Sequence, residues 1–304
     1  MIEWKTPELS DVPEMRRLAG ESGSQGSDSS AVNIFLLREK YNIRISFCDG
    51  MLYRLYTGNR MPGRAGLTFP LGPDVEKGMA KIRDDCEERG KAPCFIFLTE
   101  EQRSIVADFF PDMVFDTSDG NYDYTYTAEH LAHLAGKDNE KKRNRVNRFC
   151  RLYPDWEIRY LDRNACSLRL SDMITIEQRW FADQQERPDS TFLERIEIYE
   201  TCKYWKELDM IGAIIYSGDD PVAMTMASEI SPGCFDIHFE KCYGEYAHAG
   251  GFSAINKFFA EHLLTKYGAK WINREEDIGL EGLRKAKMAY RPDLLLKKYH
   301  TMKE

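Results

Sequence analysis

The chain has 304 residues, of which 42% are hydrophobic and 30% charged, and its formal net charge is −8. At roughly 100–200 residues per domain, this length predicts two domains, and the apolar content excludes a chain that is disordered throughout. The acidic balance argues against a general nucleic-acid coat, although it leaves room for a local basic patch. No run approaches the ~18 consecutive apolar residues of a membrane-spanning helix, and we expect no secretory signal.

The eight cysteines form no Cys-x-x-Cys pair and match no zinc-module spacing. Several lie in apolar runs such as residues 94–97, where cysteine acts as a small hydrophobic residue. We therefore expect a cytoplasmic protein with reduced cysteines and no metal. His130 and His133 are three residues apart without a neighbouring ligand set, which favours a solvated helical turn over a metal site.

The first half is predicted to combine helices with short strands. Helices are predicted over Asp11–Ala19, Asn33–Tyr41, Asp74–Arg89 and Thr99–Phe110. Strands are predicted over Ile43–Cys48, Met51–Thr57, Ala65–Leu71, Cys94–Leu98 and Met113–Phe115, with a hairpin turn at Asp49-Gly50. The turn-rich stretch Asp116–Asn121 is the predicted boundary between a domain of residues 1–118 and a second of residues 119–304.

The second half is predicted to open with a strand and to contain an antiparallel meander. Strands are predicted over Tyr122–Thr127, Ile211–Ser217, Pro221–Ile230, Cys234–Cys242, Lys270–Asn273 and Leu294–Tyr299. Helices are predicted over His130–Tyr153, Ser171–Gln185, Thr191–Leu208, Phe252–Tyr267 and Leu280–Tyr290, with a loop over Gly244–Gly251. Meander, loop, helix and strand follow the order of an acyl-CoA N-acyltransferase core, and the similar order of elements in the two halves suggests a duplication.

Three segments carry a family resemblance: DYTYTAEHLAHLAGKDNEKKRNRVNRF (123–149), IHFEKCYGEYAHAGGFSAIN (237–256) and INREEDIGLEGLRKAKMAYRPDLLLKKY (272–299). They are similar to the phosphatidylglycerol lysyltransferase C-terminal domain family, in particular to its stand-alone bacterial members. Residues 33–37 and 69–72 extend the likeness into the first half. The resemblance implies an α+β fold of two tandem GNAT-like (acetyltransferase-type) domains, with mixed, mostly antiparallel sheets flanked by helices.

The resemblance also implies a transferase related to lysyl-phosphatidylglycerol synthases and to aminoacyltransferases that use aminoacyl-tRNA. The expected reaction transfers an acyl or aminoacyl group from acetyl-CoA, another acyl-CoA or aminoacyl-tRNA to a small-molecule amine or hydroxyl acceptor. The sequence has no counterpart of the synthases' membrane-spanning half, which counts against a lipid acceptor. It also lacks the compact Arg/Gln-x-x-Gly-x-Gly/Ala loop of acetyl-CoA users. The alternative is a catalytically degenerate GNAT-like module that binds nucleotide or RNA without turnover.

Gly250 and Gly251 precede a predicted helix, where small residues let the free N–H groups of the helix start approach a phosphate. A helix start without a ligand is the alternative. The surrounding order of elements favours the phosphate site, so Gly250, Gly251 and Asn256 are predicted to bind the donor.

Residues 136–151 contain seven basic side chains against two acidic ones. Such a patch holds phosphates, whether of coenzyme A, an RNA acceptor stem or a lipid headgroup. A solvated helix face is the alternative for any charge run. The predicted donor-binding residues in this segment are Lys141, Lys142, Arg143, Arg145 and Arg148.

His238 and Glu240 are predicted to share one face of their strand with Asp236, because side chains alternate with a period of two. A histidine and a carboxylate that face a cleft can deprotonate an attacking amine, so His238 or Glu240 is the candidate base. A buried ion pair or a solvated face at the edge of the sheet is the alternative. The acyltransferase resemblance implies a tyrosine that protonates the leaving group, and Tyr290 is the candidate, with a tyrosine packed on the sheet as the alternative.

The polar run Asn273–Asp277 follows a predicted strand, at an end of the sheet where sites are often found. It is predicted to bind an amine substrate or a cation, although helix capping is favoured for Asp277. Internal salt bridges to Arg284 or Lys287 are the alternative. The predicted substrate-binding residues are Asn273, Arg274, Glu276, Arg284 and Lys287.

Overall fold

The computed structural model describes residues 1–58, 65–184 and 189–302. In the first half the helices are α1 (Val12–Ser22), α2 (Ala31–Leu36), α3 (Val75–Arg89) and α4 (Glu100–Phe109). The strands of this half are β1 (Ile43–Cys48), β2 (Met51–Tyr56), β3 (Gly66–Leu67) and β4 (Phe115–Thr117). Short 3-10 helices are η1 (Leu9–Asp11), η2 (Ser27–Ser29) and η3 (Asp119–Asn121).

The second half contains most of the strands. Its strands are β5 (Asp123–Thr127), β6 (Trp156–Leu161), β7 (Ile211–Ser217), β8 (Asp220–Ser231), β9 (Cys234–Cys242), β10 (Trp271–Asn273), β11 (Leu294–Leu296) and β12 (Tyr299–Thr301). Its helices are α5 (Ala128–His133), η4 (Lys137–Asn139), α6 (Glu140–Leu152), α7 (Ser167–Asp183), α8 (Asp189–Lys203), α9 (Gly244–Ala249), α10 (Gly251–Tyr267) and α11 (Glu281–Met288).

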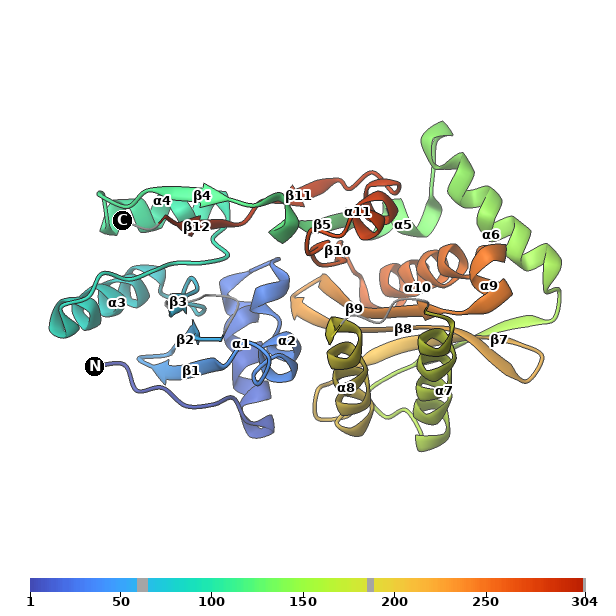
Figure 1. The fold of residues 1–304 in the computed structure, drawn as a ribbon, viewed down its shortest axis with the longest axis horizontal. Helices are drawn as coiled ribbons and strands as arrows, with labels where there is room; N and C mark the ends of the chain where they lie inside the picture. Colours follow the sequence, from blue (N-terminus) through green and yellow to red (C-terminus); the bar gives the residue numbers. More distant parts are fainter. Residues whose placement is uncertain (59–64, 185–188, 303–304) are drawn as a thin grey trace.

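The largest sheet of the described residues has the strand order β11-β5-β10-β9-β8-β7-β6. It is mixed, because β10 runs parallel to β9 while the other neighbours are antiparallel. Helices α5, α6 and α10 cover one face and α1 and α7 pack on the other (Figure 1). The smaller sheet β1-β2-β3 belongs to the first half. The predicted α+β fold, with mixed sheets flanked by helices, is therefore confirmed.

Local signals in the sequence correctly predicted several turns and helix ends. Asp49 and Gly50 have φ angles of 55° and 78° and form the tight turn between β1 and β2. Gly90 adopts a φ of 61° immediately after α3, where its N–H bonds to the helix carbonyls. Both positions need left-handed backbone, which glycine and aspartate adopt at lower cost than most residues.

The long helix predicted over His130–Tyr153 is wrong, because the chain forms two helices there. Leu134, with a φ of 47°, ends α5, and Gly136, with a φ of 81°, precedes η4 and α6. Leu134 is fully buried, so packing of this side chain fixes a turn inside a segment whose polar composition predicts a continuous helix.

Other differences concern short elements. The strand predicted over Cys94–Leu98 is reduced to isolated bridges, and the strand predicted over Ala65–Leu71 shortens to β3. The predicted loop at Gly244–Gly251 contains α9, and β6 was not predicted. The first-half helix predicted to end at Tyr41 ends at Leu36, and the predicted end at Gln185 lies outside the described residues.

The end of the chain returns to the first half. The strand predicted over Leu294–Tyr299 is instead divided into β11, which joins the large sheet, and β12, which pairs with β4. The backbone of Tyr299 also exchanges hydrogen bonds with Leu98 at 2.7 and 2.9 Å. The predicted domain boundary near residue 118 stays a prediction. Within the described ranges, no helix has the length and apolar character that crossing a membrane requires.

Candidate functional site

A β-bulge in β9 separates His238 from Glu240. Met226 of β8 pairs with Phe239, whereas the next residue, Ala227, pairs with Ile237, so His238 is the extra residue of the bulge. His238 points toward α2, and Glu240 points toward α10. The prediction that both side chains share a face is therefore wrong, since the inserted residue interrupts the alternation of side chains.

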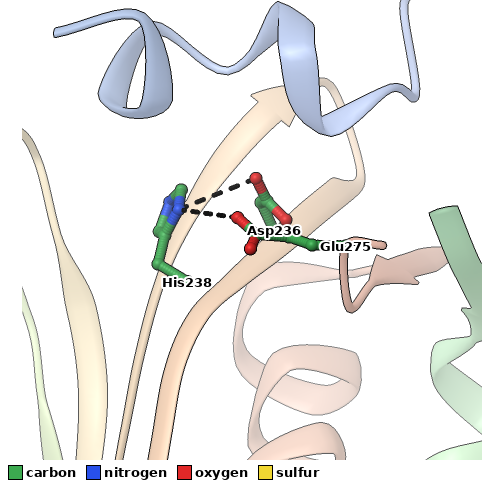
Figure 2. Close-up of side chains that lie close together, drawn as sticks. All are labelled: Asp236, His238 and Glu275. Atoms are coloured by element: carbon green, nitrogen blue, oxygen red, sulfur yellow. Dashed lines mark ion pairs between the residues drawn. The ribbon is translucent and has the colours of Figure 1, made fainter. Parts of the chain in front are cut away.

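His238 belongs to a buried polar cluster that joins the two halves, here called the Asn33 network: Asn33, Asp236, His238 and Glu275. Nδ1 of His238 bonds with Oδ1 of Asn33 at 2.9 Å, and its Nε2 lies 2.8 Å from Oγ of Ser228. Nδ2 of Asn33 donates to Oδ2 of Asp236 at 3.0 Å and to Oε1 of Glu275 at 2.9 Å. Figure 2 shows His238 and the two carboxylates, which come from β9 and from the loop after β10, pointing toward one another.

The Asn33 network concentrates negative charge away from solvent. Nδ1 of His238 lies 3.7 Å from Asp236 and 3.6 Å from Glu275. Asp236 is fully buried, and its Oδ1 has no hydrogen-bond partner among the described residues. Burial, followed by the charges of Glu275 and Asp123, raises the pKa of the Asp236 carboxyl well above its usual range. This carboxyl therefore tends to retain a proton.

The three possible ligand atoms of Asp236, His238 and Glu275 lie within 4.8 Å of one another, which is compatible with a metal centre. However, the Asn33 amide nitrogen already donates a hydrogen bond to one oxygen of each carboxylate. An N–H donor bound to these two oxygens competes with a cation for them. The geometry therefore fits a hydrogen-bonded proton network better than a metal site.

Glu275 connects this network to a pocket. Its backbone has a φ of 57°, an unusual conformation that the bond from its N–H to Oδ1 of Asn273 supports at 2.7 Å. Its side chain is 28% exposed, whereas that of His238 is 1% exposed. Glu275 is therefore the member of the pair that a bound molecule can reach.

The pocket lies between the two halves and has a volume of about 750 Å³. We call it the junction pocket. Its lining from the first half includes Asp28, Asn33, Leu37, Tyr56, Ile96 and Phe97. Its lining from the second half includes Glu275, Glu276, Ile278, Arg284 and Lys298. Pockets of this size commonly enclose a small molecule, and this one combines an apolar wall with convergent carboxylates.

Lys298 connects acidic residues of the two halves beside the junction pocket. Its Nζ lies 2.7 Å from Asp123 and 3.2 Å from Asp28, and it donates to Oγ of Ser27 at 3.0 Å. Burial by itself would lower the pKa of Lys298, but the charges of Asp123 and Asp28 outweigh it and raise the pKa. Lys298 thus remains a cation whose charge is already matched by these carboxylates.

A second polar cluster lies on the α10 side of the sheet. Glu240 accepts a hydrogen bond from Arg274 at 3.0 Å and from Asn256 at 3.3 Å. The Arg274 guanidinium and the Lys142 ammonium lie 5.2 and 3.6 Å from the ring centre of Tyr290. Burial, followed by the charges of Arg145 and Arg274, lowers the pKa of Lys142 to about 8. Burial also raises the pKa of the Tyr290 hydroxyl, so it is protonated at neutral pH.

Neighbouring chain packs closely against the two glycines of the predicted phosphate site at the start of α10. Gly250 has a φ of 117°, and a Cβ at this residue would clash with the carbonyl oxygen of Arg145 in α6. A Cβ on Gly251 would lie 2.5 Å from Sγ of Cys242 and 2.9 Å from the carbonyl oxygen of Tyr246. Close packing thus accounts for both glycines without a ligand.

The predicted basic segment divides into exposed and buried cations. Lys141, Arg145 and Arg148 are exposed on α6 at positions i, i+4 and i+7, so they lie along one side of the helix. None of the three forms an ion pair within the described part of the chain. Arg143, in contrast, donates to the carbonyl oxygens of Leu134 and Gly136 and caps the end of α5.

The polar run after β10 is used mainly for internal contacts. Nδ2 of Asn273 donates to Asp123 at 2.9 Å, and Arg284 pairs with Asp277 at 2.7 Å. Although burial opposes the effect, hydrogen bonds from Arg284 and Tyr124 lower the pKa of Asp277 to about 2. Asp277 does not cap α11, because Leu280 occupies the N-cap position.

Lys287 also lies beside this run and donates to the backbone carbonyls of Glu275 and Glu276 at 3.2 and 2.5 Å. Neither Arg284 nor Lys287 pairs with the Glu276 carboxylate, which instead lines the junction pocket. The alternative of a salt bridge from Glu276 to these cations is therefore wrong.

Residue spacing alone identifies neither Asn33 nor Glu275 as a site residue. Glu275 lies inside the polar run that the sequence predicted to bind an amine or a cation, so a signal was present for it. Asn33 contacts Glu275 across 242 positions of the chain, and no local pattern reports such a contact.

Comparisons with known proteins agree on the fold. The chain matches the family model described as "Phosphatidylglycerol lysyltransferase, C-terminal" over residues 20–301. A Bacteroides thetaiotaomicron protein of unknown function is similar over 100% of both chains, with 28% identity and a TM-score of 0.86. L-PGS from Bacillus licheniformis is similar over 99% of this chain and 93% of that one, with 13% identity and a TM-score of 0.67.

A GNAT-family acetyltransferase from Colwellia psychrerythraea covers 99% of this chain and 100% of its own, with 10% identity and a TM-score of 0.51. These last two likenesses concern the fold, which is GNAT-like. None of the curated proteins compared with this chain matches it. Because the family model extends over most of the sequence, the chain belongs to the phosphatidylglycerol lysyltransferase C-terminal domain family.

Proposed function

We propose that the protein is an aminoacyltransferase in which Glu275 acts as general base for an acceptor bound in the junction pocket. The observation that carries this proposal is the position of Glu275. Its side chain is partly exposed and lines the pocket, while Asn33 and His238 contact its carboxylate from the protein interior. A base must lie within reach of the proton that it removes. His238 is too deeply buried for this role, and Glu240 is already paired with Arg274.

In the proposed reaction, an amine or hydroxyl of the acceptor attacks the carbonyl carbon of the donor's acyl group. A new amide or ester bond forms, and the bond from the carbonyl carbon to the donor's leaving oxygen breaks. Glu275 accepts the acceptor's proton, and the leaving oxygen gains one proton. Tyr290 is buried on the α10 side of the sheet and is not among the described residues that line the junction pocket, so the proposed source of this proton is the protonated Glu275 itself.

Two observations favour aminoacyl-tRNA over acyl-CoA as the donor. Gly250 is accounted for by close packing against the backbone of α6, so this glycine gives no support to a coenzyme A pyrophosphate site. The same helix presents Lys141, Arg145 and Arg148 to solvent without carboxylate partners among the described residues, which suits an RNA backbone. The name of the family, phosphatidylglycerol lysyltransferase, agrees with a lysyl group carried by tRNA as the donor and with phosphatidylglycerol as one acceptor to test.

The test is a transfer assay with radiolabelled donors. The purified protein is incubated with tRNA charged with mixed amino acids, or with acetyl-CoA, in the presence of small amines or phosphatidylglycerol vesicles. We expect label from aminoacyl-tRNA to enter an acceptor in repeated turnovers. Label that stays on a tightly bound donor would support a binding module instead, and transfer from acetyl-CoA alone would contradict the choice of donor.

Glu275→Gln tests the base directly. The amide keeps an oxygen for the Asn33 hydrogen bond but cannot take a proton, so we expect the transfer rate to fall by about 10²–10⁴-fold. Glu281→Gln is the matched control, because Glu281 is an exposed carboxylate on α11 paired only with Lys285. An unchanged rate in Glu275→Gln would remove Glu275 from the reaction.

A further inference from the structure

The junction pocket has an apolar wall that comes from the first half. Leu37, Tyr56, Ile96 and Phe97 line it, and the rings of Tyr56 and Phe97 meet edge to face with centroids 5.6 Å apart. A wall of this kind binds a carbon skeleton and offers it no charged partner. The proposed transfer reaction by itself does not require such a surface. The wall therefore indicates that the acceptor has an apolar part.

The opposite wall carries two carboxyl groups without a matching lysine or arginine among the described residues. Glu275 and Glu276 both line the pocket, and within the described ranges neither carboxylate forms an ion pair with a lysine or arginine side chain. Both cations among the described lining residues are already engaged, because Arg284 pairs with Asp277 and Lys298 is held by other carboxylates. A half-buried carboxylate pair of this kind is costly unless a cation or a proton accompanies it.

The buried carboxyl group of Asp236 lies behind these two residues and tends to retain its proton. It shares the Asn33 amide with Glu275, it is fully buried, and its Oδ1 has no partner in the described structure. The acidic end of the pocket therefore consists of two lining carboxylates with a third carboxyl group behind them. A cationic group on the ligand would supply the missing charge and hydrogen-bond donors.

We propose that the junction pocket binds an acceptor with a primary ammonium group on an apolar or aromatic body. The ammonium group, with three N–H donors, lies at Glu275 and Glu276, and the body lies against Tyr56 and Phe97. The cavity of about 750 Å³ accommodates a small molecule of this class. This inference rests on the proposed function only in naming the bound amine as the acceptor, which Glu275 deprotonates before attack.

The first experiment measures binding of three probes to the full chain by calorimetry. The probe 4-phenylbutylamine has both features, 4-phenylbutanol lacks the charge, and butylamine lacks the aromatic body. We expect 4-phenylbutylamine to bind at least about tenfold more tightly than either of the others. Equal binding of the amine and the alcohol would overturn the charged subsite, and equal binding of the two amines would overturn the apolar one.

Variants then assign each feature to its wall. Glu275→Gln and Glu276→Gln are each expected to lower the affinity for 4-phenylbutylamine by about tenfold. The exposed Glu281→Gln control is expected to leave this affinity unchanged. Leu37→Gln, at a half-buried position of the apolar wall, is expected to lower the affinity for 4-phenylbutylamine but not the affinity for butylamine. Retained affinity in all three pocket variants, with a folded protein confirmed by circular dichroism, would place the amine elsewhere.

The failure of this inference and the failure of the proposed function give different results. If amines do not bind but the protein still transfers the aminoacyl group to another acceptor, only the acceptor class is wrong. If 4-phenylbutylamine binds with the expected dependence on Glu275 but no donor is consumed, the pocket assignment stands and the transferase assignment is wrong.

Discussion

The side-chain amide of Asn33 donates a hydrogen bond to Glu275 at 2.9 Å, although the two residues are 242 positions apart. The same nitrogen contacts Asp236 at 3.0 Å and the backbone carbonyl of Ser27 at 3.2 Å. One residue of α2 therefore fixes two carboxylates of the second half and holds them against the first half. Since Asn33 and Glu275 both line the junction pocket, the shape of the pocket depends on this contact.

We predict that Asn33→Ala destabilises the protein by about 1–3 kcal/mol, because it leaves the buried Asp236 carboxyl without its donor. The measurement is the free energy of unfolding in urea. Asn147→Ala, at an exposed position of α6, is the control and is expected to change it by no more than about 0.5 kcal/mol. Equal stability of the two variants would mean that the Asn33 amide contributes nothing to holding the carboxylates.

Much of the fold could be predicted because its signals are local. The hairpin at Asp49-Gly50 and the end of α3 at Gly90 follow from residues that tolerate left-handed backbone. The meander of β7, β8 and β9 follows from apolar strands separated by short turns. The site could be predicted only in part. The period of two that places His238 and Glu240 on one face fails at a bulge, and no residue of β9 indicates that bulge in the sequence.

The exposed cations of α6 provide a test of RNA binding. We predict that replacing Lys141, Arg145 and Arg148 together with Gln weakens binding to tRNA and makes it less sensitive to salt. With about 0.7–0.9 counterions released per phosphate contact, three lost contacts reduce the slope of log K against log[salt] by about two. The measurement is a salt titration of the binding constant by fluorescence anisotropy.

The control for this triple variant removes equal charge elsewhere. Lys77, Arg83 and Lys91 are exposed basic residues in or next to α3, far along the chain from α6. Replacing these three with Gln should leave most of the salt dependence intact. If both triple variants lower the slope equally, binding reports only the net charge, and α6 has no specific role.

The glycines before α10 test whether packing or ligand binding requires them. We predict that Gly250→Ala destabilises the fold by more than about 1 kcal/mol, because it combines a φ of 117° with a clash against Arg145. Gly268→Ala has a φ of 65° but no neighbour within 4 Å, so its cost is expected to be smaller. Gly282→Ala, in α11 with open space around it, should be neutral or stabilising by up to about 1 kcal/mol. Equal Tm values for the first and third variants would contradict the packing account.

The contacts that make Gly250 necessary also show why its role could not be predicted. A glycine before a helix is compatible with a phosphate site and with close backbone packing, and the choice depends on what lies opposite. Here Arg145 lies opposite, contributed by a helix more than a hundred residues earlier in the chain. The predicted long helix over His130–Tyr153 obscured this placement, because α6 acquires its own direction only after the break at Gly136.

Because Lys142 is buried, its contribution to the folding stability depends on pH. Its folded-state pKa of about 8 lies below the ordinary value of 10.5, because burial and then the charges of Arg145 and Arg274 disfavour the ammonium form. Between these two values the unfolded chain binds more protons than the folded protein, so this group makes stability rise with pH from about 8 toward 10.5. Below pH 8 the lysine is charged in both states and its contribution is constant.

We predict that Lys142→Met removes this dependence. The unfolding free energy of the wild type minus that of the variant should increase by about 1–2 kcal/mol between pH 7.5 and 9.5, since one unit of pKa shift corresponds to about 1.4 kcal/mol. Taking the difference cancels the pH-dependent contributions of the tyrosine and cysteine side chains that both proteins share. Lys141→Met is the control, because the neighbouring Lys141 is exposed and should give a flat difference over the same range. A flat difference for Lys142→Met as well would mean that the ammonium is solvated in the folded protein, and that its position over the Tyr290 ring is not maintained in solution.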